Sequence, residues 1–126
     1  MRAVDTNVLV RLITRDEDRQ VEAAESFISR GVWVSLVVLA ETTWVLSSAY
    51  ELDHSQIAMA VEMLLNHQKV AVQDVEVVEA ALERYRQRPA LGFSDCLVLE
   101  IARKAGHLPL GTFDRTLSKL DGVERL

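Results

Sequence analysis

The stretch RAVDTNVLVR, residues 2–11, changes character in its middle. Its apolar start is interrupted by Asp5 and Asn7 before the apolar pattern resumes. The pattern predicts a short strand over residues 2–5 and a helix over residues 7–13. In parallel α/β sheets the ligand crevice lies at the carboxyl ends of the strands, which is where this polar interruption falls. We therefore expect the interruption to serve a site.

Short β-type runs and helical patterns continue to alternate along the rest of the chain. Further strands are predicted at residues 32–35, 69–72, 110–113 and 123–126. Helices are predicted at residues 18–29, 37–50, 55–66, 75–87 and 94–105, with a short turn at 115–120. This alternation is typical of the α/β class, and it predicts a small parallel sheet with helices on both faces.

Composition limits the classes of protein to consider. The 126 residues are 49% hydrophobic, which suits one domain over residues 1–126 with a real core. No apolar run approaches the roughly 20 residues of a membrane-spanning helix, and no leader segment is evident, so we expect a cytoplasmic protein. Cys96 is the only cysteine, which excludes an internal disulfide and a thiolate cluster. The net charge of −5 argues against non-specific coating of nucleic acid, unless several carboxylates gather in one cation-binding pocket.

Glu41 is the most informative acid. It lies within SLVVLAETTWVL, residues 35–46, where apolar side chains recur at helical spacing around it. An ionised carboxylate buried without a partner costs several kcal/mol, so a buried Glu41 is expected to be paired or bound to metal. The alternative is a residue at the edge of the apolar face that leans into solvent.

Three aspartates lie at helix starts, and each has a structural interpretation on its own. Asp95 opens the helix in GFSDCLVLEIARK, where the exposed amide groups favour a carboxylate. Asp114 in GTFDRTL follows a predicted strand and can cap the turn behind it. Asp5 can cap the first helix, with Asn7 as a local hydrogen-bonding group. The four acids together, in this order, carry more information than any one of them.

The stretches DTNVLV, LAETTWVL, FSDCLVLEIAR and GTFDRTL, in this order and at these separations, resemble the PIN-domain ribonucleases. In particular they look like the toxin subunit of VapBC-type toxin–antitoxin systems. The resemblance spans essentially the whole chain. It implies a three-layer α/β/α fold with a short central parallel sheet.

The resemblance also implies that four acids converge on one or two Mg²⁺ or Mn²⁺ ions. These acids are Asp5, Glu41, Asp95 and Asp114. Hard divalent ions prefer such oxygen ligands and support attack of water on an RNA phosphodiester, which by family similarity leaves 5′-phosphate and 3′-hydroxyl ends. Asn7 and Thr112 look like groups that orient the acids by hydrogen bonds. The implied partners are an RNA substrate, a cognate antitoxin and a second copy of the chain.

Two alternatives remain open: a catalytically silent PIN-like binding or assembly module, and a solitary RNA-processing nuclease without antitoxin. A haloacid-dehalogenase-type enzyme needs a second aspartate where Asn7 stands, and a receiver domain needs a lysine at the end of a late strand. Apolar residues between positions 44 and 64 exceed what a small sheet obviously needs, so part of them either faces a partner or completes the core. The arginines of ERYRQR, residues 83–88, line a substrate path or form a solvated helix end.

Overall fold

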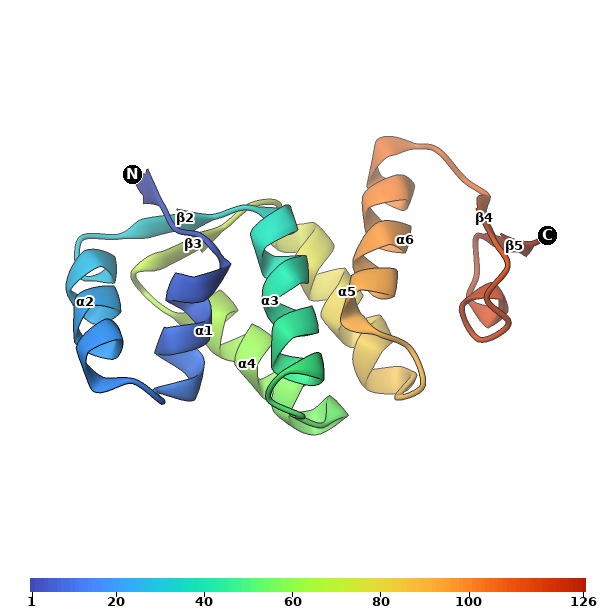
Figure 1. Ribbon diagram of the computed structural model, residues 1–126. Helices are drawn as coiled ribbons and strands as arrows, with labels where there is room; N and C mark the ends of the chain where they lie inside the picture. Colours follow the sequence, from blue (N-terminus) through green and yellow to red (C-terminus); the bar gives the residue numbers. More distant parts are fainter. The chain divides into compact units, whose positions relative to one another are not determined.

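The computed structural model describes all 126 residues. The chain forms two compact units, residues 1–75 and 76–126, which are described separately. Figure 1 shows their elements along the chain. No helix combines the length and the apolar character needed to span a membrane.

The first unit is a three-stranded parallel sheet with four helices. Its elements are β1 (Arg2–Ala3), α1 (Thr6–Thr14), α2 (Asp18–Ile28), β2 (Val32–Val34), α3 (Leu36–Ser48), α4 (His54–Asn66) and β3 (Val70–Val72). The strands are ordered β1-β2-β3, and every connection between neighbours runs through a pair of helices, as parallel pairing requires. Figure 1 shows β2 and β3 next to each other, with α1, α2, α3 and α4 extending from the sheet.

Side-chain caps define where the helices of this unit begin. Ser35 accepts a hydrogen bond from the Val38 amide and starts α3 directly after β2. Asp53 and Gln56 form a reciprocal capping box that starts α4. Such caps satisfy amide groups that the helix itself leaves without acceptors, so each helix begins at a defined position.

The core of the first unit combines β-branched strand residues with leucines from the helices. Val32 and Val34 of β2 are fully buried, as are Leu9 and Leu39. The apolar stripe of α4 belongs to the same buried set, because Ile57, Val61 and Leu64 are at most 2% exposed. Among the apolar residues between positions 44 and 64, the stripe of α4 therefore completes the core. Trp44, in contrast, remains 66% exposed.

The second unit pairs two helices with two short strands. Its elements are α5 (Val75–Gln87), α6 (Phe93–Ala105), β4 (Leu110–Thr112), a 3-10 turn η1 (Leu117–Lys119) and β5 (Val123–Arg125). Tyr85 of α5 and Phe93 of α6 pack edge to face, with ring centroids 5.7 Å apart. Gly106 takes the left-handed conformation that ends α6, with φ at 82°, as a glycine readily does.

The predicted elements are confirmed within one to two residues at each end, including the exact bounds of α5. The α/β class is confirmed as well. The structure differs from the prediction of a single parallel sheet, because β4 and β5 form a separate two-stranded parallel sheet. Their residues are exposed or half-buried, unlike the fully buried valines of β2, so they lack the apolar faces of a central strand.

Candidate metal-binding site

Asp5 lies in the turn between β1 and α1 and is the N-cap of α1. Its Oδ1 accepts a hydrogen bond from the Val8 amide at 3.4 Å, which is long for such a bond. The side chain is exposed. The capping role expected of Asp5 is therefore present, and the exposed carboxylate retains lone pairs for another ligand.

Glu41 is connected to the same turn through the residue that follows Asp5. The hydroxyl group of Thr6 donates a 2.5 Å hydrogen bond to Glu41 Oε1, joining the start of α1 to the middle of α3. Thr6 is buried, but Glu41 is exposed. The expectation of a buried Glu41 is therefore wrong: the side chain is exposed to solvent, and its carboxylate accepts one hydrogen bond from the Thr6 hydroxyl group.

Thr6 is the residue that the sequence reasoning missed. The DTN motif drew attention to Asp5 and Asn7, while the threonine between them was given no role. Asn7 is exposed and makes no hydrogen bond to a carboxylate. Its amide instead lines a groove of about 470 Å³ between α1 and α2, together with side chains that include Val8 and Phe27. The orienting role expected of Asn7 stays a prediction.

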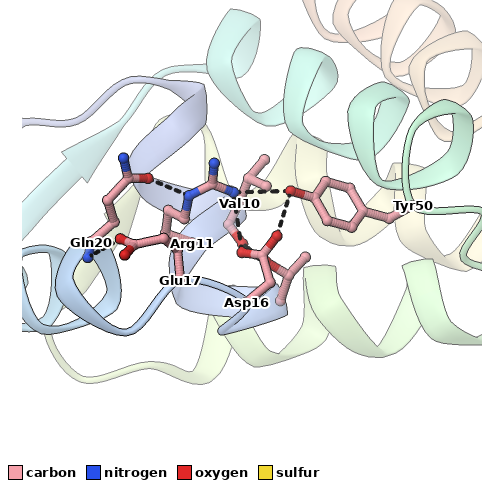
Figure 2. A network of polar contacts seen from close by, with 7 residues as sticks. Val10, Arg11, Asp16, Glu17, Gln20 and Tyr50 are labelled. Carbon is pink, nitrogen blue, oxygen red and sulfur yellow. Dashed lines mark hydrogen bonds and ion pairs between the residues drawn. The ribbon is translucent and has the colours of Figure 1, made fainter.

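Arg11, on the next turns of α1, is committed to a polar network (Figure 2). Its guanidinium donates to Gln20 of α2, to Asp16 in the intervening loop at 3.1 Å and to the Tyr50 hydroxyl at 2.9 Å. Tyr50 in turn donates to Asp16 at 3.0 Å. Hydrogen bonds from Thr14 and Tyr50 hold the pKa of Asp16 below its usual range. Arg11 thus joins α1, α2 and the chain after α3, rather than presenting a free cation to a substrate.

Asp95 lies in the first turn of α6 and is half-buried. Burial raises the pKa of its carboxyl group, the negative charge of Asp114 raises it further, and a backbone hydrogen bond with Gly92 partly offsets both. The N-cap residue of α6 is Gly92, which has no side chain, so Asp95 does not occupy the cap position itself. A carboxylate that burial and a second carboxylate both destabilise is one that a bound cation would stabilise.

Asp114 follows β4 and caps the turn that leads into η1. Its Oδ1 accepts from the Leu117 amide at 2.8 Å, and its own amide donates to Thr112 Oγ1 at 3.0 Å. The structure thus gives Thr112 a direct contact with Asp114, through the backbone. One bond fixes an oxygen of the Asp114 carboxylate and the other fixes its backbone amide, while the residue as a whole stays exposed.

Two of the four acids, Asp5 and Glu41, therefore lie in the first unit, and the other two, Asp95 and Asp114, lie in the second. None of the four has an ion-pair partner in the structure. No group of three or more His, Cys, Asp or Glu side chains is gathered at metal-binding distance. The donors are hard oxygen ligands without competing cations, which is the chemistry that Mg²⁺ and Mn²⁺ prefer. These residues consequently fit a divalent ion.

The fold and these acids define a class, an α/β protein with carboxylates at the ends of parallel strands and at helix starts. Residues 2–123 match the family model described as PIN domain, so the chain belongs to the PIN-domain family. PIN domains are generally nucleases and typically use divalent metal ions. Comparisons with curated proteins and with solved structures found no match.

Proposed function

We propose that this protein is a metal-dependent endoribonuclease whose Mg²⁺ or Mn²⁺ is bound by the four carboxylates. These are Asp5, Glu41, Asp95 and Asp114. The observation that carries the proposal is the membership in the PIN family together with four acids in family order, none of them neutralised by a basic side chain. A bound divalent ion would supply the positive charge that stabilises the phosphoryl transition state and would favour ionisation of the attacking water.

In this scheme, the four acids bind the metal ion, and neighbouring residues orient their carboxylates. Thr6, the residue after Asp5, holds the Glu41 carboxylate by a hydrogen bond, which removes rotamer freedom that metal binding would otherwise have to overcome. The hydrogen bonds of Asp114 to Leu117 and Thr112 do the same at the end of β4. Asp95 would bind the ion in its ionised form, so bound positive charge would oppose the rise in its pKa that burial and Asp114 cause.

Cleavage of a labelled RNA that contains both loops and helices tests the proposal. The full chain is incubated with Mg²⁺ or Mn²⁺ and, in parallel, with a chelator. Glu41→Gln is the informative variant, because the amide oxygen can still accept the Thr6 hydroxyl while the charge is lost. Losing a metal ligand is expected to slow cleavage about a hundredfold or more, which corresponds to several kcal/mol of transition-state stabilisation.

Glu79→Gln is the matched control, since Glu79 is an exposed helical glutamate of α5. It should cleave at the rate of the wild type. Equal cleavage with and without chelator would exclude the metal mechanism, and full activity of Glu41→Gln would remove Glu41 from the ligand set. The absence of any cleavage would favour a silent binding module.

We further propose that the enzyme is the toxin of a VapBC-type pair, and that it acts as a homodimer with a cognate antitoxin. The motifs given above support this assignment, and exposed apolar side chains on α3 support a protein partner: Val37 is 76% and Trp44 66% exposed. Induced expression should arrest growth, and a co-expressed neighbouring reading frame should relieve the arrest. A monomer in sedimentation at micromolar concentration, unchanged by that partner, would contradict both the dimer and the antitoxin.

A further inference from the structure

Helix α6 carries a buried ion pair that the proposed site does not use. Glu100 is 6% exposed, and Arg103 Nε donates to its Oε2 at 3.1 Å. A carboxylate at this depth needs a cationic partner, because desolvation of an isolated charge is costly. Arg103 supplies that partner one helical turn away and is itself only 31% exposed.

The guanidinium group of Arg103 also forms a hydrogen bond to a residue outside α6. Its Nη2 donates to the backbone oxygen of Asp121 at 2.8 Å, in the turn before β5. The next residue, Gly122, has a φ of 85°, and a Cβ built there would lie 3.4 Å from both Arg103 Nη1 and Nη2. The guanidinium therefore lies close to a glycine turn that a side chain would crowd.

Backbone hydrogen bonds continue from this turn into β4. The oxygen of Gly122 accepts from the Leu110 amide at 2.9 Å, and Leu110 is in register with Val123 of β5. At the other end of the ladder, the Leu126 amide donates to the Thr112 oxygen at 2.8 Å. The turn to which Arg103 is bonded thus provides the first backbone hydrogen bond between β4 and the segment that leads into β5.

The C-terminal end of β4 leads to Asp114. The Thr112 hydroxyl accepts the Asp114 amide, so the position of this acid follows the position of β4. β4 is only three residues long and half-buried or exposed, and it pairs with a strand of the same kind. Such a sheet has little apolar area of its own with which to hold its place, because a two-stranded pair is marginally stable in water.

We propose that Arg103 is a positioning residue, which anchors the β4–β5 sheet to α6 and thereby holds Asp114 in place relative to Asp95 on the same helix. The inference rests on the proposed function, in which both aspartates bind the metal. Arg103 touches neither metal nor substrate. It acts through Glu100, which fixes its orientation, and through Asp121, to which it is bonded.

Mn²⁺ binding to the nuclease, measured by titration calorimetry, tests this role without using cleavage as the readout. Arg103→Met keeps the apolar stem but leaves Glu100 buried and unpaired, so it is combined with Glu100→Gln to preserve folding. Arg103→Lys is the conservative variant. Lys104→Met is the matched control, because it removes a cation from the adjacent position, which forms a 3.9 Å ion pair with Glu76 of α5.

The Arg103→Met, Glu100→Gln protein is expected to bind Mn²⁺ about tenfold more weakly than the wild type, as is usual when the support of a metal ligand is lost. Arg103→Lys should be intermediate, because one ammonium group makes fewer fixed bonds than a guanidinium fork. Lys104→Met should bind like the wild type. Hydrogen exchange of the Leu110 amide, which bonds to Gly122, should accelerate in the metal-free double variant.

The decisive comparison repeats the titration in an Asp114→Asn background. If Arg103 acts through Asp114, its replacement should then weaken Mn²⁺ binding by less than about twofold, because coupled residues are non-additive. The same tenfold loss in both backgrounds, or unchanged binding in the first, would overturn the inference while leaving the metal site intact. Failure of the wild type to bind Mn²⁺ would overturn the proposed function, and this inference with it.

Discussion

Replacing Asp5 separates its two roles, because asparagine and alanine differ in what they retain. Asp5 caps α1 through a 3.4 Å hydrogen bond to Val8 and is also a proposed metal ligand. Asn caps helices as well as Asp does, but it lacks the charge that a divalent ion requires. Ala lacks both. Comparison of Asp5→Asn with Asp5→Ala therefore isolates the contribution of the cap from that of the carboxylate.

The magnitudes follow from the geometry and the length of the chain. A long capping bond places the loss in Asp5→Ala near the low end of the usual range, about 0.5–1 kcal/mol. With an unfolding entropy of about 2.1 cal/mol/K per residue over 126 residues, this loss lowers the melting temperature by about 2–4 °C. Asp5→Asn keeps the cap and loses only the charge–dipole attraction of an exposed carboxylate, so its metal-free melting temperature should stay close to that of the wild type.

The assay is thermal unfolding followed by circular dichroism, with and without Mn²⁺. At a free concentration a hundredfold above the dissociation constant, the ion stabilises the wild type by about 2.7 kcal/mol, or about 10 °C on the same scale. Both variants should lose most of this gain. If Asp5→Asn retains the full 10 °C response, Asp5 is only a helix cap, and its assignment as a metal ligand is refuted.

Three further predictions concern single groups. Thr6→Val keeps the volume of a buried side chain but removes the hydroxyl that holds Glu41, so RNA cleavage should fall about tenfold with the circular dichroism spectrum unchanged; full activity would contradict the orienting role. Because burial and the charge of Asp114 raise the pKa of Asp95 above its ordinary value, the metal-free protein should lose stability as pH rises from that value through the folded pKa; urea unfolding should show a smaller loss for Asp95→Asn than for the wild type. Burial raises the pKa of the Cys96 thiol to about 12, so iodoacetamide at pH 8 should alkylate it only after denaturation; rapid labelling of the native protein would show that the thiol is accessible.

The local sequence pattern was sufficient to predict most of the secondary structure, because the residues that start and end helices act over only a few positions. Asp53 with Gln56 and Gly106 mark helix ends that could be predicted from residue type alone. Strand pairing depends instead on distant partners. Nothing in the local pattern of residues 110–113 or 123–126 distinguishes a central strand from a separate pair, and the structure places them in a second sheet.

The candidate acids show the same difference between what the local sequence predicts and what tertiary packing decides. Glu41 belongs to a helix that is apolar in sequence, but whether the helix buries it depends on how α3 packs, and the packing leaves it exposed. Thr6 gave no signal of its own, because a threonine between two polar residues is ordinary. Its function as the donor to Glu41 exists only once α1 and α3 are in contact, 35 residues apart in the chain.

The sequence by itself determined the α/β class, the order of the elements, the family to which the chain belongs and the identity of the four candidate acids. These properties depend on residue type and spacing along the chain. The tertiary structure decided which side chains support those acids. It joined Thr6 to Glu41, committed Arg11 to Tyr50, and connected Arg103 through the Gly122 turn to the strand that precedes Asp114. Each is a contact between segments distant in sequence, and only the packing of helices and strands brings such groups within hydrogen-bonding distance.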